Sequence, residues 1–250
     1  MFRPAGLFDL SQTEHAALFD GCEFAWDALK RLKEYLEKFP NLGPTGFRRA
    51  LFALKVSAAP FNHPAAASHA NRSWVGPQVL IGEGTVVEAG VMIKGPAIIG
   101  KNCEIRHGAY IRENVIIGDD CVIGNSCEVK HSVLFNGCQA PHFNYVGDSI
   151  LGHKAHLGAG VILSNVKSLT GNITVESEGR KLDTGLRKFG ALLGDHAEIG
   201  CNAVLNPGSV IGRRSVIYPL TNWRGVLLAD MIAKNRAALE VIPHRKSSVS

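Results

Sequence analysis

Residues 93–123 read IKGPAIIGKNCEIRHGAYIRENVIIGDDCVI, and isoleucine occupies every sixth position of this stretch. The same step continues in both directions, with an aliphatic residue or Phe at every position from Val75 to Phe135 and Pro141 at the next one. Glycine follows five of these positions, as tight corners favour: Gly76, Gly82, Gly100, Gly118 and Gly124. A fixed short period predicts a β-solenoid, in which each coil buries its apolar face only against the neighbouring coils.

Beyond Pro141 the six-residue pattern changes phase and is later interrupted. We predict one slip at Val146 and another at Leu151, after which the step continues on both sides of an interruption at residues 165–190. The predicted repeat region therefore spans residues 74–220, with an inserted loop.

The insertion at residues 165–190 has features of its own. A hairpin is predicted over residues 173–182, and basic residues outnumber acidic ones by five to three. The basic residues are Lys167, Arg180, Lys181, Arg187 and Lys188. A long excursion from a regular scaffold is commonly functional. Plain surface decoration is the alternative.

The segments on either side of the repeats are predicted to be helical in part. Residues 11–14 and 20–23 match capping boxes, and a helix with apolar residues at helical spacing follows and ends at Pro40. Residues 1–73 are thus a helical N-terminal extension and an irregular connection, with a short helix near residues 48–55. In the C-terminal segment, residues 221–250, a closing helix is predicted over residues 226–239.

The bulk composition narrows the function classes. The chain has 250 residues and a formal net charge of +5, which suits phosphorylated small molecules, and it lacks a basic block with interleaved aromatic residues, so nucleic acid is not expected. No stretch is long and apolar enough for a membrane span, and the N-terminus does not read as a secretory signal. Six cysteines without a CxxC pair indicate reduced thiols, and the expected localisation is cytoplasmic.

A resemblance to a known family rests on a second group of residues. The string Pro141-His-Phe-Asn-Tyr-Val-Gly-Asp148 is followed by His156-Leu-Gly-Ala-Gly160 and Asn165. With Arg112 and Lys130 upstream, this resembles the acetyltransferase domain of the bifunctional glucosamine-1-phosphate acetyltransferase/N-acetylglucosamine-1-phosphate uridylyltransferase, a hexapeptide-repeat protein. The spacing from Arg to Lys, the spacing from Lys to His and the His-x-x-Tyr-x-Gly-Asp string all agree. The resemblance covers residues 75–165 and 190–220, and nothing in the chain resembles the uridylyltransferase domain.

The resemblance implies a mainly β fold: a single-stranded left-handed parallel β-helix of hexapeptide repeats, with N-terminal and C-terminal helices. Its triangular coils stack residues that lie 18 apart, which would place Cys103 under Cys121 in the interior and align Lys94, Arg112 and Lys130 in one column. Stacked like charges destabilise a sheet surface. We interpret the column as a phosphate site, with a solvated basic stripe as the alternative.

The resemblance also assigns site residues. His142 is implied to be the general base, with Glu128 as its orienting neighbour. The residues implied to bind the acceptor are Arg112, Lys130, Tyr145, His156 and Asn165; those implied to lie near the acyl-CoA are Ala159, Cys201 and Lys188. The family has an asparagine where this chain has His156, and this difference puts the identity of the acceptor in question.

The expected chemistry is coherent without the family name. Acyl transfer from a thioester to an amine needs a base that titrates near neutral pH, and an imidazole meets that need. A backbone N–H of residues 158–160 could stabilise the oxyanion. The other histidines lack the spacing of a shared zinc site, so no metal is expected.

Two functions remain open at this point. The first is a homotrimeric acyltransferase that uses acetyl-CoA or another acyl-CoA and acts on a phosphorylated or nucleotide-linked sugar. The second is a non-catalytic module that binds sugar nucleotides or drives oligomerisation, related to sugar nucleotidyltransferases.

Overall fold

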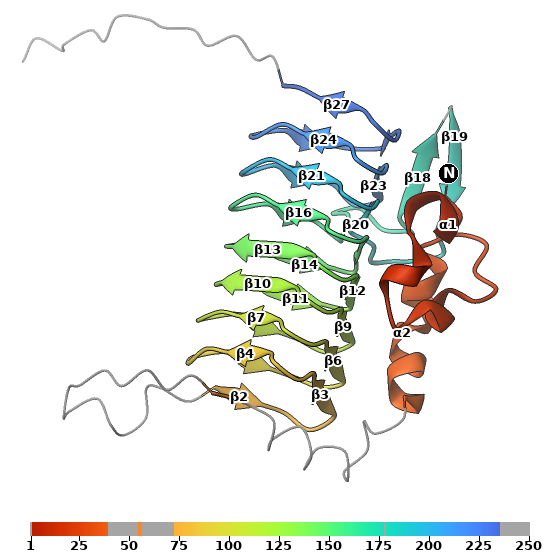
Figure 1. Ribbon diagram of the computed structural model, residues 1–250. Helices are drawn as coiled ribbons and strands as arrows, with labels where there is room; N and C mark the ends of the chain where they lie inside the picture. The colour runs from red at the N-terminus through yellow and green to blue at the C-terminus, as the bar shows by residue number, and fades with distance from the viewer. Residues whose placement is uncertain (1, 40–54, 57–72, 178, 236–250) are drawn as a thin grey trace, which may run out of the picture.

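The computed structural model describes residues 2–39, 55–56, 73–177 and 179–235, and its main body is a column of stacked β-coils (Figure 1). Three parallel sheets form the sides of this column, and each coil contributes one short strand to each sheet. The N-terminal helices lie along one side, and a two-stranded hairpin projects beside them (Figure 1). The fold is the expected left-handed parallel β-helix.

The strands form three long parallel sheets and one antiparallel hairpin. Sheet A contains β1 (Lys55–Val56), β4 (Val86–Val87), β7 (Glu104–Ile105), β10 (Val122–Asn125), β13 (Gln139–His142), β16 (His156–Leu157), β21 (Glu198–Ile199), β24 (Val216–Ile217) and β27 (Ile232–Ala233). Sheet B contains β2 (Trp74–Val75), β5 (Met92–Ile93), β8 (Tyr110–Ile111), β11 (Glu128–Lys130), β14 (Tyr145–Gly147), β17 (Ile162–Leu163), β22 (Val204–Leu205) and β25 (Asn222–Trp223). Sheet C contains β3 (Val79–Ile81), β6 (Ala97–Ile99), β9 (Val115–Ile117), β12 (Ser132–Leu134), β15 (Ile150–Leu151), β20 (Ala191–Leu193), β23 (Ser209–Ile211) and β26 (Val226–Leu227). The hairpin is β18 (Thr174–Ser177) and β19 (Arg180–Asp183).

The six-residue period places one aliphatic side chain per strand inside the column. Ile93 pairs with Ile111, and Ile111 with Val129, so residues 18 apart stack as expected. All three are fully buried in one continuous cluster that fills the interior. Cys103 and Cys121 lie in the same cluster. Each coil thus completes the core of the next, which is why the pattern repeats.

The first phase slip occurs earlier than the sequence suggested. Leu134, not Phe135, pairs with Ile117 and points inward, and Ala140 takes the interior place expected for Pro141. The corner at His131, which has a left-handed backbone (φ 45°), is one residue shorter than the corners before it. The second slip, to Leu151, is confirmed.

The outer face of sheet C is apolar along its whole height. Its outward positions form one aliphatic column: Leu80, Ile98, Ile116, Val133, Ile150, Leu192, Val210 and Val226. The N-terminal segment covers this column, and Phe135 packs there against Phe8 with ring centroids 5.1 Å apart. Sheet C is therefore buried on both faces, as its continuous apolar strands require.

The N-terminal segment forms α1 (Pro4–Leu7), the 3-10 turns η1 (Leu10–Gln12) and η2 (Ala16–Phe19), and α2 (Asp27–Lys38). The two predicted capping boxes are wrong: Asp9 caps η1, and no side chain caps α2. Helix α2 ends before Pro40, as expected. The helix predicted near residues 48–55 lies outside the described residues except for Lys55, which is in β1.

The closing helix predicted over residues 226–239 is also wrong as far as the structure describes it. Residues 226–227 and 232–233 are strands β26 and β27, which pair with β23 and β24. The open edge of the preceding coil offers backbone partners to this segment, and the pairing outweighs its helical spacing. The inward-facing residues Trp223 and Leu227 are only four residues apart. Because this corner is short, the six-residue period cannot be recognised in the sequence at this point. Residues 236–239 lie outside the described residues.

Candidate functional site

The corner between sheets B and C gathers charged side chains from successive coils. Lys94, Arg112 and Lys130 follow the paired interior residues Ile93, Ile111 and Val129, so they stack as the 18-residue spacing implied. The column is not purely cationic. Each cation has a carboxylate partner within 4 Å: Lys94 with Glu113 (3.7 Å), Arg112 with Glu128 (2.9 Å) and Lys130 with Asp148 (3.3 Å).

Arg112 is fixed on several sides, and its Nε lies 3.7 Å from Glu113 Oε2, an ion pair too long for a hydrogen bond. Its Nη1 donates to Glu128 Oε1, and its guanidinium lies 5.9 Å from the centre of the Tyr110 ring. The hydrogen bond to Glu128 is the main reason that the pKa of Arg112 lies above its usual value. Its Nε is buried and has no hydrogen-bond partner among the described residues. Such an unpaired donor is costly unless a ligand or water accepts from it.

Lys130 and Asp148 form the buried part of the same corner. Their side chains are only 16% and 7% exposed. The Asn165 amide donates to Asp148 Oδ2. Tyr145, on β14, lies beside Asn165, and burial raises the pKa of its hydroxyl. Four of the five residues expected to bind the acceptor therefore lie together, and Asp148 joins them although the sequence reading gave it no role.

The inserted loop is anchored at this corner. It leaves the solenoid at Asn165 and returns at Gly190. The Phe189 N–H donates to the Asn165 carbonyl (2.9 Å), and the Gly190 N–H donates to the Asp148 carbonyl (2.8 Å). Lys188 is exposed next to this closure. The insertion and the charged corner thus form one structural unit.

His142 lies at the opposite end of the same coil's sheet B strand. It ends β13, at the corner between sheets A and B, and its side chain is exposed. Backbone contacts hold its position: its N–H donates to Asn144 Oδ1 (3.1 Å), and its carbonyl accepts from the Gly160 N–H (3.0 Å). No described residue hydrogen-bonds its imidazole, and Glu128, which was expected to orient it, accepts a hydrogen bond from Arg112 instead.

The glycine-rich segment after His156 joins the His142 corner. The Gly160 N–H contacts His142, as above, and the Ala159 carbonyl accepts from the Asn202 N–H (2.8 Å), next to the exposed Cys201. Three residues expected near the reacting groups, His142, Ala159 and Cys201, therefore lie at one corner. Lys188 lies at the other corner, with the insertion.

His156 stands apart from both groups on the outer face of sheet A. Its Nδ1 is 2.8 Å from Glu198 Oε2, one coil above. This pairing fixes one ring nitrogen and leaves the other open. The sequence reading missed Glu198, although the register of β16 and β21 could have indicated it.

The remaining histidines of interest are held by backbone carbonyls. His107 Nδ1 lies 2.6 Å from the Ala89 oxygen, His131 Nε2 lies 3.0 Å from the Leu29 oxygen, and His153 Nδ1 lies 2.8 Å from the Asn136 oxygen. Across the described ranges, no group of three or more His, Cys, Asp or Glu side chains is arranged to hold a metal ion.

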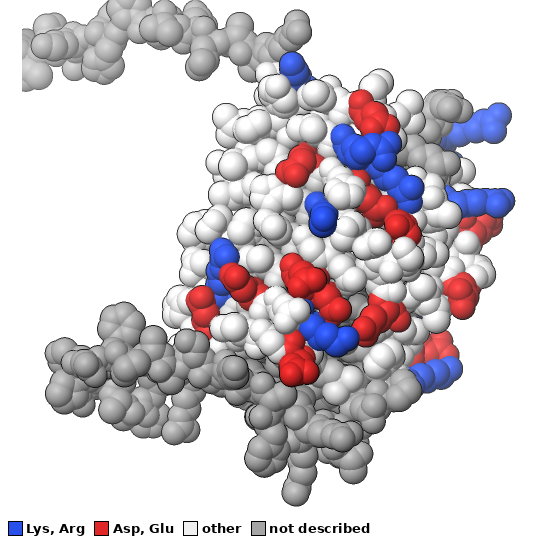
Figure 2. Space-filling model, viewed as in Figure 1, with Lys and Arg blue, Asp and Glu red and all other residues white. Residues whose placement is uncertain are grey.

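The wider surface is mixed in charge. On the face shown in Figure 2, blue Lys and Arg side chains are interspersed with red Asp and Glu side chains rather than separated from them. In the part of the chain that the structure describes, no helix is long and apolar enough to cross a membrane.

Comparison with known proteins finds relatives of the central segment of the chain. Residues 93–180 match the family model described as the GMPPB C-terminal domain. The chain is 37% identical over 88 residues to a bifunctional sugar-1-phosphate nucleotidylyltransferase/acetyltransferase of Sulfurisphaera tokodaii, and 36% identical over 86 residues to the bifunctional protein GlmU of Methanococcus vannielii. These segments cover 35% and 34% of this chain but only 22% and 20% of those proteins. The resemblance to hexapeptide-repeat transferases is confirmed for this segment.

Solved structures add a looser likeness. An Arabidopsis UDP-N-acetylglucosamine acyltransferase has 15% identity and a TM-score of 0.39, with 64% of each chain covered. The acetyltransferase domain of PglB from Neisseria gonorrhoeae, in complex with acetyl coenzyme A, has 16% identity and a TM-score of 0.24, with 64% of this chain and 50% of that chain covered. At this overlap, the fold assignment rests on the strand pairing of the chain itself.

Proposed function

We propose that this protein transfers an acyl group from an acyl-CoA to a phosphorylated or nucleotide-linked sugar. The observation that carries the proposal is His142: an exposed imidazole that no described residue hydrogen-bonds, held by its backbone beside the segment that contains Ala159. Cys201 lies on the other side of this segment, one coil above it. The matched segment, residues 93–180, includes this histidine and the charged corner. The role of acyl-CoA as the donor is inferred from the relatives, and no contact within this chain indicates it.

His142 would act as the general base. Its imidazole accepts the proton of the acceptor's amine or hydroxyl while that group attacks the thioester carbonyl. The C–S bond then breaks, and the imidazolium returns the proton to the departing thiolate. A backbone N–H from the segment of residues 158–160 would stabilise the charge on the carbonyl oxygen.

Arg112 would bind the phosphate of the acceptor. Its Nε–H makes no hydrogen bond to any described residue, and Glu128 and Tyr110 hold the guanidinium plane. A preorganised guanidinium suits a phosphate because its donors match two oxygens at once. Lys130, Tyr145 and Asn165 would complete this subsite.

The proposed site is divided between the His142 corner and the charged corner, and this separation suggests that a second subunit completes it. His142 and Asp148 bracket β14, six residues apart, which is on the order of 15–20 Å of extended chain. A single small acceptor does not bridge that distance. We propose a homotrimer in which the His142 corner of one subunit faces the charged corner of its neighbour. A contact between Glu128 and His142 across that interface stays a prediction.

Thiol release from acetyl-CoA, measured with glucosamine-1-phosphate, other phosphorylated amino sugars and nucleotide sugars as acceptors, tests the proposal. Acceptor-dependent release supports it. A complete absence of release with every acceptor and with longer acyl donors would contradict it.

The second candidate is a non-catalytic sugar-nucleotide-binding module. It is favoured by the internal pairing of Lys94, Arg112 and Lys130, an arrangement typical of a structural cluster. Under this alternative, nucleotide sugars bind in calorimetry while no thiol is released.

A further inference from the structure

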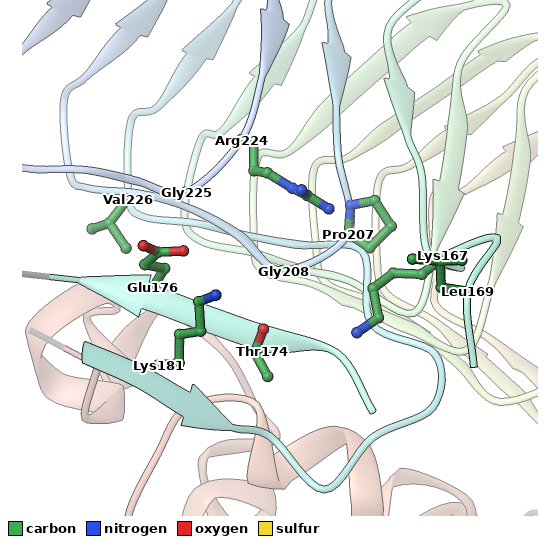
Figure 3. Close-up of a pocket in the computed structure, with 10 residues that line it drawn as sticks. All are labelled: Lys167, Leu169, Thr174, Glu176, Lys181, Pro207, Gly208, Arg224, Gly225 and Val226. Atoms are coloured by element: carbon green, nitrogen blue, oxygen red, sulfur yellow. The ribbon is translucent and has the colours of Figure 1, made fainter. Parts of the chain in front are cut away.

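A cavity of about 580 Å³ lies between the hairpin and the upper coils of the solenoid, and none of its lining residues belongs to the proposed acyl-transfer site (Figure 3). The lining residues come from the insertion and from the corner between sheets B and C: Lys167, Leu169, Thr174, Glu176, Lys181, Pro207, Gly208, Arg224, Gly225 and Val226. Its volume is in the range of small-molecule sites.

The hairpin is held firmly against the solenoid on one side of this cavity. Ile173 and Val175 are fully buried in the cluster that also contains the N-terminal helices. Gly208 has a left-handed backbone (φ 84°), and a Cβ there would lie 2.8 Å from Ile173 Cγ2 and 2.9 Å from the Thr174 oxygen. The insertion therefore packs directly on the coil, and the cavity is a built feature of the fold.

Alternation along the hairpin decides which side chains face the cavity. Glu176 pairs with Lys181 across the two strands, on the same face as Thr174. Val175 and Leu182 point the other way, into the apolar cluster. Arg180 pairs with Ser177 and shares the face of Leu182, so it points away from the cavity.

The cavity carries an excess of positive charge. Three cations and one carboxylate line it, which gives +3 − 1 = +2. The Lys167 ammonium donates to the Asn172 carbonyl. No described residue forms an ion pair with Lys181 or Arg224. In the charged corner, by contrast, Lys94, Arg112 and Lys130 each have a carboxylate partner. Figure 3 shows Lys167 and Arg224 extending from opposite walls.

We propose that this cavity binds the diphosphate of a nucleoside diphosphate ligand. Separate lysine and arginine side chains around one space can contact several phosphate oxygens, and the guanidinium adds a two-pronged contact. Apolar surface from Leu169, Pro207 and Val226 lies beside them for a base or ribose. Two sources share this chemistry: a nucleotide-linked sugar and the nucleotide end of an acyl-CoA. The inference goes beyond the proposed transfer, because binding requires neither His142 nor catalysis.

Calorimetry with the full chain tests the site. The ligands are UDP-N-acetylglucosamine, CoA and dephospho-CoA, and the variants are Lys181→Ala, Arg224→Ala and the matched control Arg180→Ala, which removes the same charge from the opposite face of the hairpin. We expect each cavity variant to weaken binding of the preferred ligand about 10-fold or more, and the control less than about 2-fold. Equal weakening by all three variants, no effect of the cavity variants, or no binding of any ligand would overturn the proposal.

The ligands also identify the source. Tighter binding of the sugar nucleotide assigns the cavity to the acceptor side, and tighter binding of CoA and dephospho-CoA assigns it to the acyl donor. A His142→Ala protein separates this inference from the proposed function: it should bind as the wild type does, whether or not transfer is lost. Loss of cavity binding in His142→Ala would contradict an independent site.

Discussion

At the scale of single residues, the charged corner changes what the sequence implied about stability. A column of three cations should be strained by repulsion, so that removing one should barely lower the melting temperature or should raise it. In the structure, Lys130 neutralises a carboxylate that is itself almost buried, since the side chain of Asp148 is 7% exposed. Pairing, and not repulsion, is therefore the main electrostatic interaction at this position.

Lys130→Ala should lower the free energy of unfolding by about 1–3 kcal/mol, because the Asp148 carboxylate loses a charged partner inside the protein. Urea titration of the variant and the wild type measures the difference. Lys94→Ala is the matched control: its pair with Glu113 is longer and more exposed, so its loss should be clearly smaller. An increase in stability in Lys130→Ala would restore the repulsion hypothesis.

The residue types in the proposed site were largely predictable, but their pairing was not. The spacing of Arg112 and Lys130 was enough to stack them at one corner, because the register of a solenoid is fixed by its period. Tyr145 pairs with Glu128, and only the direction of its side chain brings it to this corner. The partners Glu113, Glu128 and Asp148 come from side-chain directions at corners, which a period does not determine.

At the scale of elements, the solenoid contacts the N-terminal helices through the half-buried His131, and the buried His15 lies within the N-terminal segment itself. His131 Nε2 lies 3.0 Å from the Leu29 oxygen in α2, and His15 Nδ1 lies 3.0 Å from the Tyr35 hydroxyl. Burial lowers the pKa of both imidazoles below their usual value. Below pH 6.5 the unfolded chain therefore takes up protons that the folded protein does not.

Stability should consequently fall as the pH drops below about 6.5, toward the lowered pKa values of the folded state. Chemical unfolding at pH 7.5 and pH 5.5 measures this change, and His131→Gln should reduce it because one of the two groups is gone. A pH dependence identical in the wild type and His131→Gln would show that His131 does not contribute.

Gly208→Ala tests the packing of the hairpin on the coil. The added Cβ would meet Ile173 and the Thr174 carbonyl, and the positive φ disfavours alanine, so we expect a loss of about 1–2 kcal/mol in unfolding free energy. Thermal unfolding by circular dichroism measures it. Gly171→Ala is the control: its φ is also positive, but nothing lies within 4 Å of its Cβ. Equal losses in both variants would mean that the hairpin contact contributes little.

Some elements escaped the sequence analysis for physical reasons. Leu134 and Phe135 are both apolar, so the six-residue pattern alone could not show which one points inward. The segment after Trp223 has helical spacing, but the exposed edge of the coil below it captures the chain as strands. The sequence did indicate the cover on sheet C in part: strands such as Ile98-Ile99 and Ile116-Ile117 are apolar on both faces and buried. In sheets A and B, by contrast, some strands carry charged outward residues, such as Glu104 and Glu128.

At the scale of the whole molecule, one side of the triangular column is already occupied. The N-terminal helices cover sheet C, so partner subunits must use sheets A and B. Those faces carry partly exposed apolar side chains, among them Met92 and Ile162 on sheet B and Ile232 on sheet A. Their burial would favour association.

We predict a homotrimer in solution at micromolar concentration. Light scattering coupled to size-exclusion chromatography measures the mass, and Ile162→Glu should weaken the assembly because it places a charge in the proposed interface. Leu228→Glu is the control, since Leu228 is 56% exposed at the corner between sheets C and A, away from both halves of the proposed site. A stable monomer would contradict the proposal that the active site is shared between two subunits.

The most direct test of the central claim is the turnover of His142→Ala. If His142 is the general base, kcat should fall by roughly 10² to 10⁴, the usual contribution of a positioned base, while KM for the acyl donor changes little. His196→Ala, an exposed histidine at the corner between sheets C and A, should leave both parameters unchanged. Acyl transfer at the wild-type rate in His142→Ala would contradict the assignment of this residue as the base.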